Sequence, residues 1–257
     1  GNLEKHAALE SFRLDAARTL TLTQGVQETL RASPYLALVS ALGRTFADWT
    51  GQPRVVIETE GHGREALFEN IEAGRIVGWL TSVYPLVFDA RNMSVWGDAV
   101  SALRLVKESV RKIPRNGLSF GLVRDRGALS SFAGAQVLFN YLGRTDFGDD
   151  GHAALKPIDS QFGAARSGRC ERAFISEINA RLSGGELICD FSYNSRIHRP
   201  ATINELGQRF IAALSELLDT ADSPDASASV SSDFPLANLS AGDFDDLAAR
   251  LDALDED

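Results

Sequence analysis

The chain has 257 residues, of which 44% are hydrophobic and 24% are charged, and a chain of this kind can bury a sizeable core. Its formal net charge of -9 opposes binding to nucleic-acid phosphates or to an anionic membrane surface, so we expect neither partner. No apolar run approaches the roughly 20 residues that span a bilayer, and the N-terminal residues lack the order of a signal peptide, so we expect a cytoplasmic protein.

The first predicted element is a strand from Phe12 to Leu22, where apolar residues alternate, and two helices are expected to follow it. The second helix has clear boundaries, because Ser33 can cap it, Pro34 suits its first turn, and Gly51 lies at its expected end. The next residues, Val55 to Ile57, are apolar and β-branched, which predicts a buried strand.

A polar loop from Glu60 to Glu65 follows this strand and combines two carboxylates, an imidazole and a guanidinium. Two glycines flank His62, so the backbone there can approach a ligand closely. A carboxylate at the end of a buried strand, beside such a loop, indicates a proton-transfer site. His62 is a candidate ligand, base or loop-organising residue. Arg64 can set the loop or the charge of Glu60, or form a solvated ion pair with Glu65.

Beyond the loop we expect a short helical turn from Arg64 to Ile71 and an extended run from Arg75 to Phe88. A further helix is predicted to begin at Ser94 and to stop before Pro114.

The second half of the chain is richer in strands. They are predicted over Gln136 to Leu142, and over Arg172 to Leu182 and Glu186 to Tyr193, which form a hairpin in which Cys189 faces the region of Ala180. A capping box of Thr202 and Glu205 predicts a helix that runs to about Leu218. This alternation of elements predicts an α/β fold with a parallel or mixed sheet.

Composition also suggests how the chain is divided. Residues 1–219 form the expected body, residues 220–232 read as a linker of Ala, Ser, Asp and Pro, and residues 233–257 hold a small apolar anchor and an acidic amphipathic helix. That last helix either packs on its own domain or docks another protein.

Cysteine and histidine spacing points to no metal site. Cys170 and Cys189 lie far apart in the expected hairpin register, so we expect reduced thiols, and the four histidines form no HxxxH pair. A dinucleotide fingerprint at Gly61 is disfavoured because Glu58 and Glu60 would repel a pyrophosphate. A nucleophile-elbow pattern around Ser119 follows a turn and not the buried strand that it requires.

Three separated segments resemble the epimerization domains of nonribosomal peptide synthetases, within the condensation-domain superfamily. Glu60 to Glu65 is similar to that family's EGHGRE motif, Arg75 to Pro85 to its RTVGWFTxxYP motif, and Phe139 to Gly143 to its FNYLG motif. Ile76 and Leu80 depart from the second motif. The resemblance extends from about Phe12 to Leu239.

This resemblance implies a chloramphenicol-acetyltransferase-like lobe, in which a mixed β-sheet is flanked by helices. The family's HHxxxDG motif belongs to an N-terminal lobe, and no two histidines are adjacent in these 257 residues. The chain therefore resembles the C-terminal lobe alone, and an isolated lobe is expected to be inactive because the active site lies in the tunnel between two lobes.

The resemblance also implies the chemistry. Glu60 would be one of two acid/base groups that move the Cα proton of an aminoacyl or peptidyl thioester, and the second histidine of HHxxxDG would face it. Asn140 and Tyr141 would hold the substrate or an enolate-like intermediate by hydrogen bonds. Residues expected to bind substrate or to organise the loop are His62, Arg64, Trp79 and Ser82.

No metal or diffusible cofactor is implied, since the substrate arrives on the 4'-phosphopantetheine of a peptidyl carrier protein domain. The other implied partners are the N-terminal lobe and, through the C-terminal helix, a downstream synthetase subunit. Two alternatives remain open: a lobe of a condensation domain, which forms amide bonds, and a non-catalytic module that binds a carrier or a neighbouring subunit.

Overall fold

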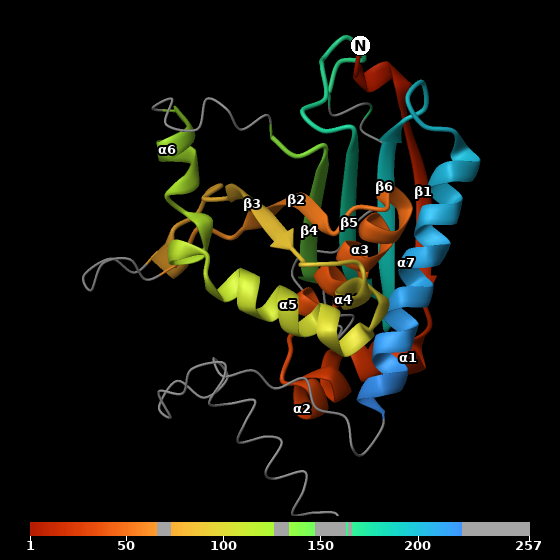
Figure 1. Cartoon of the computed structure of the whole chain (residues 1–257). Helices are drawn as coiled ribbons and strands as arrows, with labels where there is room; N and C mark the ends of the chain where they lie inside the picture. The colour runs from red at the N-terminus through yellow and green to blue at the C-terminus, as the bar shows by residue number, and fades with distance from the viewer. Residues whose placement is uncertain (66–72, 126–133, 147–162, 164–165, 223–257) are drawn as a thin grey trace, which may run out of the picture.

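The computed structural model describes residues 1–65, 73–125, 134–146, 163 and 166–222, and most of them belong to one six-stranded sheet and the helices packed on it (Figure 1). The strand order is β1-β6-β5-β4-β2-β3. β2, β4 and β5 are mutually parallel neighbours and the other pairs are antiparallel, so the predicted mixed sheet is confirmed. The strands are β1 Ala7–Leu14, β2 Arg54–Gly61, β3 Ser82–Asp89, β4 Val137–Arg144, β5 Ser176–Ser183 and β6 Glu186–Asn194.

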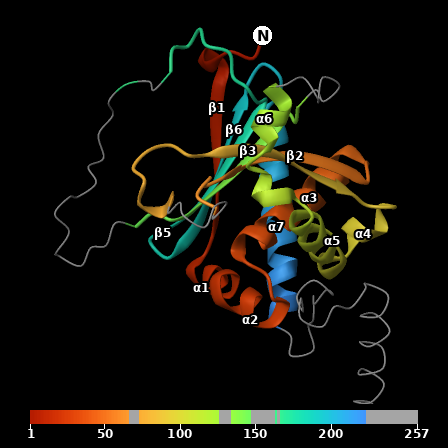
Figure 2. The ribbon, with the colours of Figure 1, turned by 90° about the vertical axis from the view of Figure 1, so that its left-hand side faces the viewer.

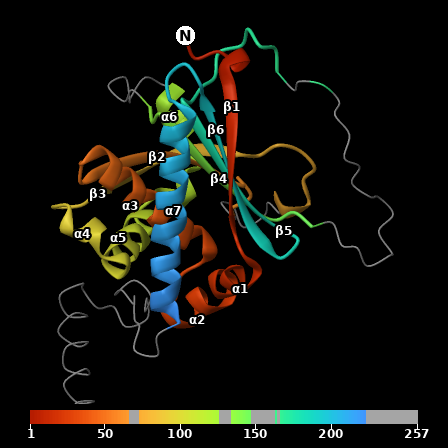
Figure 3. The same ribbon diagram turned by 90° about the vertical axis from the view of Figure 1, so that its right-hand side faces the viewer.

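The three longest described helices, α3, α5 and α7, lie together on one side of the strands, as the two perpendicular views show (Figures 2 and 3). The opposite side of the strands is called the open face below. The α-helices are α1 Ala16–Leu20, α2 Val26–Leu30, α3 Pro34–Thr50, α4 Ser94–Gly97, α5 Ala99–Arg111, α6 Phe120–Asp125 and α7 Pro200–Ala221. The 3-10 helices are η1 Glu4–His6, η3 Ala73–Arg75 and η4 Pro114–Gly117, and η2 Thr21–Gly25 is a π-helix.

Strand alternation explains why one face is apolar and the other polar. In β5 every second residue, beginning with Ser176, is buried against the helices, and the residues between them are half-buried on the open face. The same alternation sends Ile57 and Thr59 of β2 toward the helices and Glu60 to the open face. The polar residues of the open face that matter below are Glu60, Asn140, Glu177, Asn179, Arg181 and Asp190.

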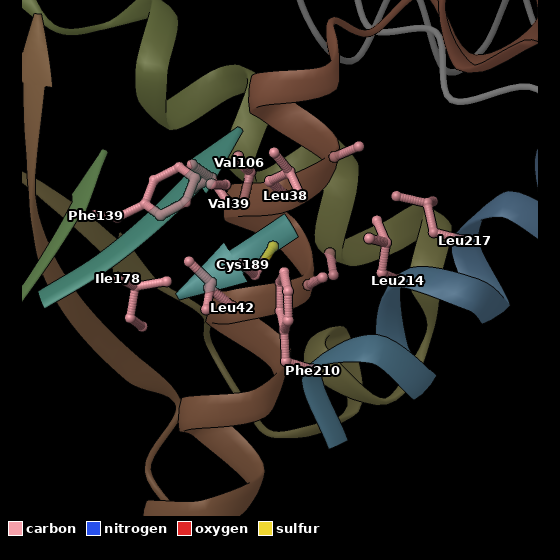
Figure 4. Packing of buried hydrophobic residues seen from close by; sticks show 14 of the residues in the cluster. Leu38, Val39, Leu42, Val106, Phe139, Ile178, Cys189, Phe210, Leu214 and Leu217 are labelled. Carbon is pink, nitrogen blue, oxygen red and sulfur yellow. The ribbon is translucent and has the colours of Figure 1, made fainter. Parts of the chain in front are cut away.

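The core fills the space between the sheet and the helices (Figure 4). Phe191 of β6 links the layers, because its ring centroid lies 5.1 Å from that of Phe12 and 5.8 Å from that of Phe210. Gly207 lets α7 approach β1 closely, since a Cβ added there would lie 2.0 Å from the Phe12 ring. Other buried members of this core are Leu38, Leu42, Val106, Phe139, Ile178 and Leu214.

Several predicted elements are confirmed. Ser33 Oγ accepts a hydrogen bond from the Leu36 N–H at the start of α3, and Gly51 ends that helix in the left-handed conformation. The predicted hairpin is β5 and β6, with Ala180 opposite Cys189. Both cysteines are free thiols.

The predicted strand from Phe12 to Leu22 is wrong beyond Leu14. Asp15 ends it, because its carboxylate accepts the Arg18 N–H at 2.9 Å and so starts a helical segment that buries Thr19 and Leu22. The predicted helix from Ser94 is also interrupted, at Asp98, whose carboxylate caps α5 by accepting the Ser101 N–H.

Three further expectations are corrected. The extended run from Arg75 is a strand only from Ser82, since η3 precedes it and residues 76–81 are irregular. The capping box is not formed, because α7 begins at Pro200 and Glu205 instead pairs with Arg209 at 2.7 Å. α7 reaches Ala221, so the first residues of the predicted linker are helical. The rest of that linker, the acidic helix and most of the turn predicted after Arg64 lie outside the described residues.

Candidate active site

The two motif segments around Glu60 and Asn140 meet at the centre of the sheet. β2 and β4 pair in parallel, with Glu58 opposite Leu138 and Thr59 opposite Phe139, which places the next residues, Glu60 and Asn140, side by side on the open face. Asn140 Nδ2 donates a hydrogen bond to Glu60 Oε2 at 3.0 Å, although 80 positions separate the two residues. The carboxylate expected at the strand end is therefore present and held by a neighbouring amide.

The surroundings of Glu60 oppose its negative charge. Burial raises the pKa of the Glu60 carboxyl, and the like charge of Glu177 on β5 raises it further. Proton transfer is most efficient when the pKa of the transferring group lies near the working pH, so a raised pKa suits a carboxyl to this role. The sequence motifs did not identify Glu177, whose only signal was the polar alternation in its strand.

Tyr141 lies on the other side of the sheet from Glu60. Alternation along β4 turns its side chain toward the helices, where it packs against the apolar core, and burial raises the pKa of its phenol. The structure therefore brings Asn140, but not Tyr141, to Glu60, and the expected Asn-Tyr pair does not line one shared surface.

Arg64 braces the segment that connects β2 to β3. Its guanidinium donates to the carbonyl oxygens of His62 at 3.2 Å, Ile76 at 3.2 Å and Gly78 at 2.9 Å. The planar guanidinium presents several donors in a fixed geometry, so it can hold carbonyls from both ends of the connection at once. Residues 73–81 are called the arm below.

The glycine at position 63 is required by the arm. Gly63 has φ +65°, and a Cβ added there would lie 1.6 Å from the carbonyl oxygen of Leu80. The sequence predicted that these glycines let the backbone approach a ligand closely, and at Gly63 the structure shows a close approach of another kind. The group that approaches is the backbone of the arm.

His62 and Glu65 organise the same turn. The exposed imidazole of His62 accepts the Arg64 N–H through Nδ1 at 2.9 Å, and its Nε2 lies 3.8 Å from Glu65 Oε1. The Glu65 side chain is only 10% exposed. Arg64 and Glu65 therefore do not form the solvated ion pair that the sequence offered as an alternative. The contacts of His62 and Arg64 agree with the loop-organising role expected of them.

Trp79 and Ser82 occupy different settings. The arm stands out on the open-face side of the sheet (Figures 2 and 3) and carries Val77 and Trp79 with their surfaces 100% and 95% exposed. Ser82 begins β3 opposite Gly61, and its buried Oγ has no hydrogen-bond partner among the described residues. Within the described part of the chain, neither side chain makes a hydrogen bond to Glu60.

A second polar row crosses the open face beyond Asn140. Asn179 of β5 lies opposite Asn140 on one side and Asp190 of β6 on the other. Asp190 accepts hydrogen bonds from Ser11 Oγ and from Arg181. Sequence reasoning missed this row, because it arises from the pairing of strands that are distant in the chain.

A cavity lies at the other end of the strands. It holds about 370 Å³ between the end of α3 and the start of α7, and its lining includes Trp49, Val55, Val137 and His198. Glu60 lies at the far end of β2 and takes no part in it.

The described residues contain no group of three or more His, Cys, Asp or Glu side chains arranged to hold a metal ion. Among the described helices, none combines the length and the apolar character that crossing a membrane requires.

Comparison with known proteins gives consistent matches. The family model for the condensation domain matches residues 4–239. A linear gramicidin synthase from Brevibacillus parabrevis is 33% identical over 252 residues, which cover 93% of this chain and 3% of that protein. Tyrocidine synthase 1 of the same organism is 29% identical, with 93% of this chain and 23% of that protein covered. The chain therefore spans a small part of these synthetases.

Solved structures show the same relationship. The epimerization domain from the third module of tyrocidine synthetase B aligns with a TM-score of 0.75 and 27% identity, over 86% of this chain and 49% of that structure. The first condensation domain of the CDA synthetase aligns with a TM-score of 0.57 and 20% identity, over 84% of this chain and 46% of that structure, and so shares the fold.

Proposed function

The chain belongs to the condensation-domain family, and from this premise we propose that it is one lobe of a nonribosomal peptide synthetase epimerization domain. Such a lobe would help to interconvert the L and D configurations at the Cα atom of an aminoacyl or peptidyl thioester. The observation that carries the proposal is the half-buried Glu60 carboxyl, with its raised pKa, held by Asn140 on the open face.

The proposed reaction needs two proton transfers. The ionised Glu60 carboxylate takes the Cα proton, and the electron pair of the C–H bond moves through Cα to the thioester carbonyl oxygen, which forms an enolate. A second acid/base group then returns a proton to Cα from the opposite side, and the carbonyl re-forms. Positioned proton transfer of this kind contributes roughly 10²- to 10⁴-fold to the rate.

Asn140 is proposed to position the base. Its amide holds Oε2 of Glu60, whereas Oε1 accepts no hydrogen bond from the described residues. One carboxylate oxygen is thereby fixed and the other is available to the substrate. This role differs from the direct contact with the intermediate that the motif suggested, and it explains why an amide and a carboxylate occur together.

The partners follow from the same proposal. The substrate would arrive on the 4'-phosphopantetheine of a peptidyl carrier protein domain, and the second acid/base group would come from a second lobe. The 49% coverage of the solved epimerization domain supports a second lobe of similar size. Docking to a downstream subunit through the C-terminal helix remains a prediction, since that helix lies outside the described residues.

A condensation lobe is the alternative that the fold comparison keeps. Two observations favour epimerization over it. The epimerization-domain structure aligns with the higher TM-score and identity. Amide formation between two carrier-bound substrates also requires no proton removal from Cα, and so gives no use for the Glu60–Asn140 pair in the form observed.

The decisive experiment joins this chain to a second lobe and supplies a carrier loaded with an L-aminoacyl group in deuterated water. We expect deuterium to enter at Cα, and we expect Glu60→Gln to lower that exchange by at least about 10²-fold. Glu205→Gln, at an exposed position of α7, is the matched control and should exchange at the normal rate. Normal exchange in Glu60→Gln would refute the assigned base, and amide formation from two loaded carriers would identify a condensation lobe.

A further inference from the structure

Asn179 occupies the next position of the open face beyond Asn140. It pairs with Asn140 across the parallel β4–β5 ladder, and Asn140 in turn neighbours Glu60. Adjacent strands lie about 4.8 Å apart, so the Asn179 backbone is about 10 Å from that of Glu60. One substrate molecule can therefore reach both residues, with its reacting carbon atom at Glu60 and another of its groups at Asn179.

The side chains of the residues on either side of Asn179 already make hydrogen bonds, whereas the Asn179 side chain makes none. Asn140 donates to Glu60, and Asp190 accepts from Ser11 and Arg181. Within the described residues the half-buried side-chain amide of Asn179 makes no hydrogen bond and no other polar interaction. Half-buried polar groups normally find partners, so this free amide is the point of the row that is available to a ligand.

We propose that Asn179 binds a secondary amide of the substrate whose Cα atom reacts at Glu60, an inference that rests on the function proposed above. A primary amide presents an N–H donor and a C=O acceptor side by side, which complement the C=O and N–H of a secondary amide. Asn179 would thereby hold the substrate in register with the base.

A thioester of the proposed kind carries secondary amides in two places. The phosphopantetheine arm contains them on the thiol side of the reacting carbon, and a peptidyl substrate has a peptide bond on the other side. The side chains of Glu60 and Asn179 cover part of the roughly 10 Å between their backbones, so an amide a few bonds from the reacting carbon atom can lie against Asn179.

The test compares four thioesters in the two-lobe protein: one amino acid and one dipeptide, each on pantetheine and on ethanethiol. Loss of one hydrogen bond should lower the kcat/KM of Cα exchange about five- to tenfold in Asn179→Ala, for substrates that carry the bound amide. The aminoacyl ethyl thioester has neither amide and should be unaffected. A loss confined to the two pantetheine substrates identifies the arm, and a loss confined to the two dipeptides identifies the peptide bond.

An equal loss with all four substrates would indicate a structural role for Asn179, and no loss with any of them would exclude the contact. Asn204→Ala, at an exposed position of α7, is the matched control and should leave all four rates unchanged. Glu60→Gln should abolish exchange with every substrate, so a failure of the proposed base is distinguished from a failure of Asn179.

A direct binding measurement covers the case in which no exchange is seen. The side-chain NH₂ resonances of Asn179 in the chain should shift when a dipeptidyl pantetheine amide is added, and those of Asn204 should not. An Asn179 signal that stays in place at saturating ligand would overturn the proposal.

Discussion

Glu60 is a carboxyl group whose surroundings favour its protonated form, and that setting is assembled from three strands. β2 supplies the residue, β4 supplies the amide that holds it, and β5 supplies the like negative charge of Glu177. A carboxyl in such a place exchanges its proton closer to neutral pH than an exposed one does.

Glu177→Gln should lower the pKa of Glu60, because removal of a nearby negative charge makes the ionised carboxylate easier to form. Burial is the larger cause of the raised pKa, so the shift should be only partly reversed. A pH titration of the chain that follows the Glu60 side-chain carbon by NMR measures this directly. Glu186→Gln, an exposed glutamate at the β5–β6 turn, should leave the titration in place. An unshifted midpoint in Glu177→Gln would mean that burial acts alone.

At this scale the sequence predicted the strand-end position of Glu60 and its neighbour Asn140, but not Glu177 or Asn179. The apolar run before it and the polar loop after it are local signals, so they placed the carboxylate at a strand end. Glu177 and Asn179 reach the same surface only through strand pairing, which no local pattern reports.

Among the elements, the arm depends on a single side chain. Three carbonyl oxygens on both sides of the β2–β3 connection accept hydrogen bonds from Arg64, and Gly63 allows the two sides to touch. A lysine in place of Arg64 would keep the charge but lose the fork of donors.

We expect Arg64→Lys to loosen the arm while the sheet and its helices keep their stability. A lysine can keep one of the two hydrogen bonds to the arm, and the lost one is worth about 1 kcal/mol, so the opened arm should be populated roughly fivefold more often. Cleavage by chymotrypsin after the exposed Trp79 should accelerate by a similar factor, since cleavage follows the open population when opening is fast. Arg13→Lys, in an exposed ion pair with Glu186, should be cut at the normal rate. Equal rates in Arg64→Lys and the unmodified chain would show that the brace is dispensable.

The elements themselves were predictable where their signals are local. α3 has a serine cap, a proline in its first turn and a terminal glycine, and it forms as predicted. The strand predicted through Leu22 failed because an alternating pattern continued past Asp15, whose capping hydrogen bond starts a helix. The capping box at Thr202 failed because the helix begins two residues earlier, at Pro200.

The described residues form a two-layer structure in which α7 packs directly on β1. The close approach is set by Gly207, over which the buried Phe12 ring lies. Helix propensity alone would favour alanine at this position by about 1 kcal/mol, so packing and propensity here make opposite predictions.

We expect packing to win, and Gly207→Ala to destabilise the chain by about 1 to 3 kcal/mol, because a Cβ would overlap the Phe12 ring in a filled core. Urea denaturation measures the difference. Gly121→Ala on α6 is the matched control, since its Cβ would meet open space and should be neutral or stabilising by up to about 1 kcal/mol. A more stable Gly207→Ala variant would show that the two layers can separate without cost.

For the molecule as a whole, the motifs indicated the condensation-domain superfamily and a mixed sheet, and both are confirmed. They could not indicate which face of the sheet each motif residue would occupy. Asn140 and Tyr141 are adjacent in the FNYLG-like segment, yet they point in opposite directions, so only Asn140 reaches Glu60.

The nearly complete exposure of Trp79 has a practical consequence. Of the three tryptophans, Trp96 is buried and Trp49 is partly covered. The fluorescence of Trp79 is therefore the most sensitive to a molecule that binds the arm. A domain that closes over this side of the sheet would dehydrate that ring and shift its emission to shorter wavelength. The fluorescence emission of Trp79 would thus report the binding of another domain to the arm.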